Sequence, residues 1–70
     1  MTFEELDIGT LQGLEDRNVS ILREANITTI GALMRLTSYE CRMVPRLGQE
    51  GFKNVATVLL GKYGKHFKDI

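Results

Sequence analysis

The sequence contains few of the residues that stabilise small domains covalently or through metal ions. Its 70 residues include one cysteine, one histidine and one proline, and no tryptophan. A single thiol can form neither an internal disulfide nor a cysteine-rich zinc site. Stability must therefore come from packing, in a chain so short that only about 60% of its unfolded surface can be buried.

Long apolar runs are also missing. No stretch approaches the roughly 20 apolar residues that are needed to cross a bilayer. The start, MTFEE, is acidic and lacks the basic region and apolar stretch of a secretory signal. The sequence therefore predicts a cytoplasmic protein without a membrane segment.

Side chains arranged for catalysis are not recognisable either. Cys41 has no neighbouring base to activate its thiol, and His66 lies in a basic tail beside Lys65 and Lys68. There are no paired carboxylates in a predicted pocket and no metal-ligand spacing. We therefore expect neither an enzyme nor a cofactor, and we predict that Cys41 is a small packed residue and His66 a solvated one.

Charge is balanced over the whole chain but unevenly distributed. Residues 1–16 hold five acids and no base, whereas residues 17–70 carry nine Lys and Arg against four acids, a formal charge of +5. This asymmetry favours a surface for a polyanion facing away from an acidic arm, although a solvated mixed surface would give the same composition.

The spacing of apolar residues predicts four helices and no strand, and so an all-α fold. The first helix can be capped by Glu15 or Asp16 and ends near Glu24. The last begins near residue 48 or 49 and runs to about Tyr63. No segment alternates with period two for long enough to form a strand.

Two short helices are expected between these. Thr28 or Thr29 can cap the first of them, which presents its inward side chains over residues 30–36. Thr37 and Glu40 fit a capping box that opens the next one. That helix is expected to end at Val44, because the residue before a proline is pushed out of the helical region.

The last helix is expected to supply the main core. Phe52, Val55 and Leu59 lie at helical spacing, and burying all three would contribute on the order of 5–9 kcal/mol. Met34 and Met43 are expected to fill gaps in this core.

Three parts of the chain are distinguished by composition. We expect an acidic arm or short helix at 1–10, a helical domain at 11–64 that stops at Gly64, and a frayed basic tail at 65–70. The apolar residues of the arm could instead pack against a second copy of the chain, so the oligomeric state stays open.

One five-residue pattern occurs twice, 17 residues apart. An apolar residue, two others, a second apolar residue and a glycine stand at Ile27–Gly31 and again at Val44–Gly48. In each, a predicted helix has ended and the glycine begins the next one, which is typical of a helix-hairpin-helix motif. Main-chain amides at such helix starts attract phosphate. The alternative is that both glycines only allow tight helix packing.

Three blocks of the sequence share the patterns of one family. They are LEDRNVSIL at Leu14–Leu22, ANITTIGAL at Ala25–Leu33 and VPRLGQEGF at Val44–Phe52. These blocks resemble the C-terminal domain of the bacterial RNA polymerase alpha subunit. The corresponding family patterns are L-x-x-R-x-x-N-x-L, Ala-x-Ile-x-Thr-Ile-Gly-x-Leu, and an apolar residue with Pro-Asn-Leu-Gly followed by Lys and Ser.

The resemblance implies a compact domain of four to five helices that binds the DNA minor groove and phosphates, with docking surfaces for transcription regulators. Arg17 would enter a narrow, A·T-rich minor groove, where the negative potential is focused. Ser20, Arg46, Gly48 and Lys53 would complete the DNA-binding surface, with Arg46 holding a phosphate through two of its guanidinium nitrogens.

The sequence also departs from the family pattern. Ser20 and Arg46 replace asparagines, and Glu50 and Gly51 stand where a lysine and a serine that contact phosphate are usual. A carboxylate at position 50 repels phosphate and would cancel roughly one of the contacts that release counterions.

The leading hypothesis is a small stand-alone DNA-binding protein associated with transcription. The alternative is a protein-interaction module of the same fold that docks a transcription factor or part of RNA polymerase without contacting DNA. For Arg17 the alternative is an ordinary surface arginine paired with Glu24 or with an acid of the arm.

Overall fold

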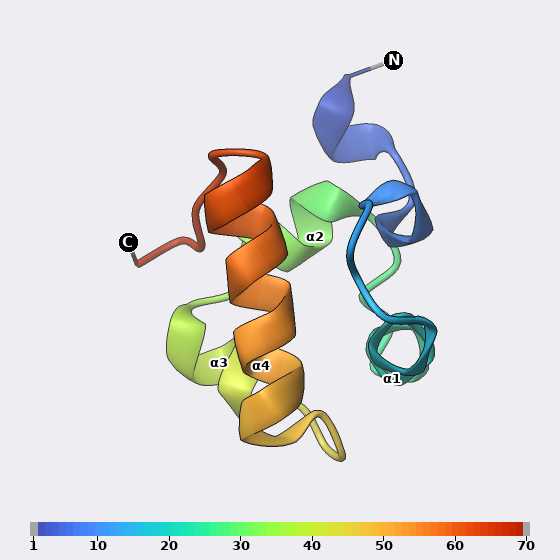
Figure 1. Ribbon diagram of the computed structural model, residues 1–70, viewed down its shortest axis with the longest axis vertical. Helices are drawn as coiled ribbons and strands as arrows, with labels where there is room; N and C mark the ends of the chain where they lie inside the picture. The colour runs from blue at the N-terminus through green and yellow to red at the C-terminus, as the bar shows by residue number, and fades with distance from the viewer. Residues whose placement is uncertain (1, 70) are drawn as a thin grey trace.

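The computed structural model describes residues 2–69, and they form an all-α domain (Figure 1). Its elements are, in chain order, η1 (Phe3–Glu5), η2 (Ile8–Thr10), α1 (Asp16–Glu24), α2 (Ile30–Met34), α3 (Ser38–Arg42), α4 (Gly48–Ala56) and η3 (Thr57–Lys62). The first two are 3₁₀ turns, and the last is a π-helical continuation of α4. Residues 2–69 contain no β-strand, only an isolated bridge between Asp7 and Thr29. The predicted all-α class is therefore confirmed.

The helix starts follow the predicted caps with one exception. The Thr29 side chain accepts a hydrogen bond from the Ala32 amide at the start of α2. Thr37 and Glu40 form the complete capping box of α3. Glu15 occupies the N-cap position of α1, but its side chain makes no capping hydrogen bond, so the prediction of a Glu15 cap is wrong in this respect.

The third helix ends two residues earlier than predicted. It stops at Arg42. The Met43 amide is shared between Tyr39 O, four residues back, and Glu40 O, three residues back, and the Val44 amide donates to Cys41 O, three residues back. These tighter bonds satisfy the end of the helix before the chain reaches Pro45, which cannot continue it.

The last helix spans the predicted residues but changes its hydrogen bonding. From Thr57 it widens to a π-helix, and the Tyr63 amide donates to the carbonyl of Val58, five residues back. Gly64 follows with φ +65°, the left-handed stop that the sequence predicts.

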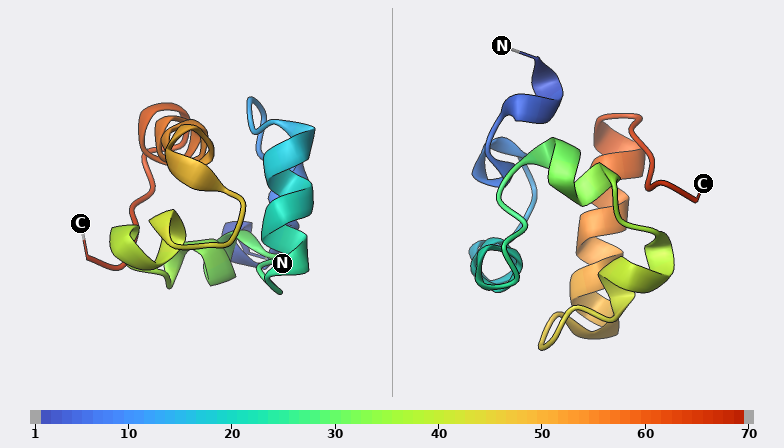
Figure 2. Two further views of the ribbon diagram at one scale, coloured as in Figure 1. Left: turned by 90° about the horizontal axis from the view of Figure 1, so that it is seen from below. Right: turned by 180° about the vertical axis from the view of Figure 1, so that it is seen from behind.

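Helix α4 runs from top to bottom in Figure 1 with α1 seen end-on to one side, and α2 and α3 come in front of α4 when the molecule is seen from behind (Figures 1 and 2). Val55 and Leu59 are buried as predicted, whereas Phe52 is only half-buried, which corrects the expectation that it is a fully buried core residue. The buried apolar core comprises Ile8, Leu11, Leu14, Ile21, Leu22, Ile27, Ile30, Leu33, Cys41, Val44, Leu47, Val55, Val58, Leu59 and Phe67.

The predictions for the sulfur-containing residues are only partly correct. Cys41 is fully buried, and burial raises the pKa of its thiol to about 11, so it is the small packed residue that was expected. Met34 is half-buried against the core. Met43 is 60% exposed, so the prediction that it fills a core gap is wrong.

The acidic arm is part of the folded unit. Ile8 is completely buried, its amide donates to Thr28 O at 2.9 Å, and the Ile30 amide donates to Leu6 O at 3.0 Å. The Arg23 guanidinium donates to the Asp7 carboxylate at 2.8 Å. Because Ile8 is used inside its own chain, it is not free to pack against a second copy.

The basic tail is also held to the domain, so the prediction of a frayed tail is wrong. Phe67 is 2% exposed and stacks on Phe52 at 5.7 Å between ring centroids. The Lys68 amide donates to Leu36 O, and Ser38 donates through its amide and hydroxyl to the Asp69 carboxylate. His66 is exposed, as expected.

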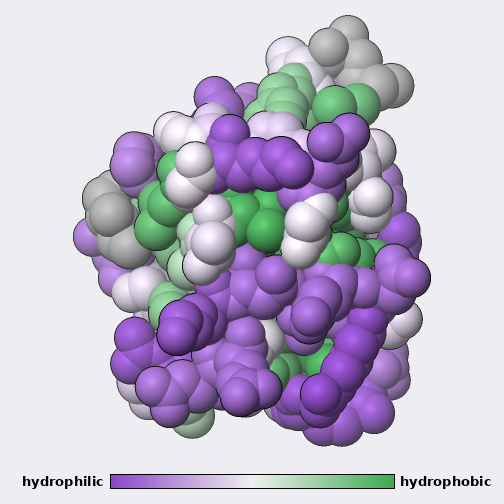
Figure 3. Space-filling model, viewed as in Figure 1, coloured by the Kyte–Doolittle hydropathy of each residue, from purple (hydrophilic) through white to green (hydrophobic). Residues whose placement is uncertain are grey.

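On the face seen in Figure 3, hydrophobic residues show mainly as a band across the upper half. Hydrophilic residues predominate below it. No helix within residues 2–69 is both long and apolar enough to span a bilayer.

Stability is expected to fall in acid because of the two carboxylates that hold the arm and the tail. Hydrogen bonds from Arg23 and the Gly9 amide lower the pKa of Asp7, and those from Ser38 lower the pKa of Asp69. Their contribution is complete above the unfolded-state pKa of about 3.9 and is lost as pH falls through the lower folded-state values. Denaturant unfolding at pH 7 and at decreasing pH below 4 should show this loss, and the double variant Asp7→Asn, Asp69→Asn should lose less stability than wild type over the same interval.

Substitution of three glycines by alanine would test the effect of backbone strain alone, because the added Cβ has space at all three positions. A Cβ at Gly48, Gly61 or Gly64 would meet nothing within 4 Å, but Gly48 and Gly64 have φ of +68° and +65°. Alanine at either of these two should therefore lower the free energy of unfolding by about 1–2 kcal/mol. Gly61→Ala, on the helix, should raise it by about 1 kcal/mol. Thermal unfolding measures the three changes, and a Gly48→Ala variant as stable as wild type would contradict the left-handed turn.

Candidate nucleic-acid interface

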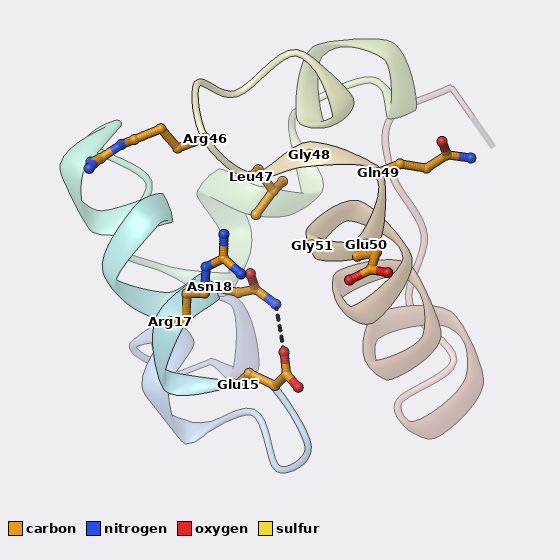
Figure 4. Close-up of a pocket in the computed structure, with 9 residues that line it drawn as sticks. All are labelled: Glu15, Arg17, Asn18, Arg46, Leu47, Gly48, Gln49, Glu50 and Gly51. Carbon is orange, nitrogen blue, oxygen red and sulfur yellow. Dashed lines mark hydrogen bonds between the residues drawn. The ribbon is translucent and has the colours of Figure 1, made fainter.

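A surface hollow of about 290 Å³ lies between the first turn of α1 and the start of α4 (Figure 4). Three of the five residues predicted to bind DNA line it: Arg17 from α1, and Arg46 and Gly48 from the turn before α4. The other residues lining this hollow are Glu15, Asn18, Leu47, Gln49, Glu50 and Gly51.

The turn that precedes α4 leaves the helix start open. Arg46 and Gly48 both have left-handed φ, +70° and +68°, which reverses the chain within four residues of Val44. Leu47, at the N-cap position, has no side-chain acceptor for the first amides of α4. Gly48 and Gln49 are exposed, and both line the hollow.

Arg17 is the free cation of this hollow. Its side chain is exposed on the first turn of α1 and forms no ion pair within residues 2–69. Figure 4 shows its guanidinium over the hollow, with the Glu50 carboxylate on the opposite side. The alternative pairing with Glu24 is not observed.

Glu24 pairs instead with Arg46. One terminal nitrogen of the Arg46 guanidinium donates to both carboxylate oxygens of Glu24, and this bond raises the pKa of Arg46. In Figure 4 the Arg46 side chain extends away from Arg17, toward the far end of α1. Arg46 is therefore already engaged with Glu24. This differs from the sequence prediction, in which Arg46 holds a phosphate through two nitrogens.

The remaining two predicted residues lie outside this hollow. Ser20 is exposed on α1 but does not line it. Lys53 is exposed on α4 and lines a neighbouring hollow of about 410 Å³ together with Glu15, Glu50, Asn54 and Thr57. Glu15 and Glu50 border both hollows, so two carboxylates stand beside the cations.

The two copies of the glycine pattern differ in access. Gly31 is buried, and a Cβ on it would lie 3.0 Å from the Glu4 carbonyl oxygen and 3.1 Å from the Glu4 Cβ. The arm therefore covers the start of α2, which lines a separate hollow with Glu4, Met34 and Arg35. The expectation that both glycine-started helices present bare amides is wrong, and only the start of α4 is open.

A buried amide pair fixes the walls of the hollow and was missed by the sequence analysis. Asn18 is 3% exposed, and its Nδ2 donates to Asn54 Oδ1 at 2.9 Å. Asn54 Oδ1 also accepts from the Glu15 amide at 3.1 Å, while its Nδ2 donates to Gly13 O at 3.1 Å. The signal was present, because Asn18 falls on the apolar stripe of α1 between Leu14 and Ile21.

Gly51 is required where α4 meets α1. A Cβ here would lie 2.7 Å from Leu47 Cδ1 and 3.0 Å from Asn18 Oδ1. A side chain at this position could therefore not be placed without moving both neighbours.

Within residues 2–69, no three or more His, Cys, Asp or Glu side chains are gathered closely enough to hold a metal ion. Comparison with protein-family models and with curated proteins finds no match to this chain.

Loss of the asparagine pair should destabilise the domain measurably. Asn54→Ala leaves the Asn18 amide and the Gly13 carbonyl without their partners, which should cost about 1–3 kcal/mol in urea unfolding. Gln49→Ala, an exposed change on the same helix, is the matched control and should stay within about 0.5 kcal/mol of wild type. Equal stability of the two variants would show that the amide pair does not hold α1 to α4.

Proposed function

We propose that this domain is a small DNA-binding, transcription-associated protein that contacts one phosphate at the start of α4 and inserts Arg17 into the adjacent minor groove. One observation carries the proposal: Arg17 is exposed and unpaired within the described chain, and it lines the same hollow as the uncapped start of α4. In this proposal the turns at 27–31 and 44–48 are two helix-hairpin-helix motifs, and the domain is built like the C-terminal domain of the polymerase alpha chain.

The chemistry of the two parts is complementary. Uncapped amides and the helix dipole favour an anion at the start of a helix. A guanidinium is weakly hydrated and is favoured in a narrow minor groove, which is a property of A·T-rich duplexes. The two contacts can therefore be made together. The phosphate contact at α4 positions the domain, and Arg17 gives a preference for a narrow minor groove.

The sequence blocks that resemble the polymerase family support this assignment. The block that contains Arg17 forms the start of α1, and the block that contains Gly48 forms the turn and the first half of α4. These are the two walls of the hollow.

Electrostatics limit the affinity. Glu15 and Glu50 border the hollow, and Arg46 is neutralised by Glu24. Few phosphates are therefore contacted, and because each contact contributes about 0.9 to the slope of log K against log salt, the dependence on salt should be shallow.

The test is titration of a fluorescent A·T-rich duplex by anisotropy at two salt concentrations. Arg17→Ala should weaken binding by about 1–3 kcal/mol. Glu50→Lys should strengthen it and steepen the salt slope by about one unit. Arg35→Ala, an exposed arginine in the separate hollow beside Gly31, is the control and should bind as wild type does.

The proposal fails if wild type, Arg17→Ala and Glu50→Lys bind the duplex equally and without dependence on salt.

A further inference from the structure

A second surface, on the other side of α4, has a different character. The groove between α3 and α4 has a volume of about 350 Å³ and is lined by Arg42, Gln49, Phe52, Lys53, Ala56 and Thr57. We call this groove, with the exposed side of α3 beside it, the α3–α4 face.

The charge of the groove is of one sign. Its lining contains two cations and no carboxylate, whereas each of the four other hollows described on residues 2–69 is lined by at least one glutamate. The lining therefore attracts an anion and adds no carboxylate of its own that would repel it, while Lys53 also lines the neighbouring hollow that Glu15 and Glu50 border.

The cations border an apolar floor. The Arg42 guanidinium carbon lies 5.0 Å from the centroid of the Phe52 ring. This cation–π contact holds the guanidinium group at the edge of the groove. Phe52 is in turn stacked on the buried Phe67, so the floor is rigid. Ala56 leaves room over the helix surface between Phe52 and Thr57.

The exposed apolar side chains of α3 extend this surface. Tyr39 is 66% exposed and Met43 is 60% exposed. With Arg42 they occupy positions i, i+3 and i+4, which share one side of the helix. Large apolar residues gathered beside a groove mark protein contact surfaces more often than solvated ones.

We propose that the α3–α4 face binds an acidic, amphipathic peptide segment of a partner protein. Carboxylates of the segment pair with Arg42 and Lys53, and an apolar side chain between them fills the space above Phe52 and Ala56. A DNA backbone also offers anions but has no apolar side chain to cover the floor, so the groove fits a peptide better.

The proposal is tested with the full chain and three probes of similar length. Each probe is used unlabelled for the ¹⁵N spectra and with a fluorescent label for anisotropy. The first is a 12-residue peptide with Glu and Leu at helical spacing, the second the same peptide with Gln in place of every Glu, and the third an A·T-rich duplex. Amide shifts in ¹⁵N spectra locate each probe, and anisotropy measures its affinity. We expect the acidic peptide to shift Arg42, Phe52 and Ala56, and to bind more tightly at low salt than at high salt.

Two variants change the charge of the groove in opposite directions. Arg42→Gln should weaken binding of the acidic peptide by about two- to fivefold, and Thr57→Lys should tighten it by a similar factor. Lys62→Gln, on the exposed end of the same continuous helix, removes one charge outside the groove and should leave the affinity unchanged. Thr57→Lys is expected to bind the acidic peptide more tightly. A misfolded variant would bind it more weakly, so misfolding cannot produce the expected pattern.

Three results would overturn the proposal: equal affinity for the Glu and Gln peptides, shifts outside the α3–α4 face, or tighter binding of the duplex than of the acidic peptide at this face. The peptide experiment uses other probes and other variants than the Arg17 titration, so either can fail while the other succeeds.

Discussion

Contact between side chains of α4 and α1 is the constraint on which the candidate interface depends. Gly51 allows it, because a Cβ at this position would lie 2.7 Å from Leu47 Cδ1 and 3.0 Å from Asn18 Oδ1, and both side chains would have to move. The amide pair of Asn18 and Asn54 then joins the two helices and ties both to the loop before α1. Without this contact the hollow would have no fixed width, and Arg17 would have no fixed position relative to the start of α4.

Much of the fold could be predicted from the sequence because it is encoded locally. Capping residues, the proline after α3 and the glycine after η3 act within a few residues of the element that they start or stop. The threonine caps at 29 and 37 and the left-handed Gly64 are therefore as expected. These signals say little about what packs against a helix, which is why exposed Met43 and half-buried Phe52 were both assigned to the core.

The arm, the tail and the candidate interface depend on contacts between residues far apart in the chain. Glu4 covering Gly31 and Asp69 bonding to Ser38 have no signature in either local sequence. The pairing of Arg46 with Glu24 spans 22 residues and was missed for the same reason. Arg46 also adopts the left-handed conformation, which residues other than glycine, asparagine and aspartate rarely do.

Because the arm covers Gly31, only one of the two glycine-pattern turns, the one before α4, is exposed. The proposed complex therefore has one phosphate contact with the Arg17 contact beside it, and a bound domain could still rotate about so small an area. In the proposed DNA complex, long occupancy would then require two such domains on one duplex or a tether to another DNA-bound protein. Linkage of that kind raises the effective concentration to the millimolar range without adding any contact to the domain itself.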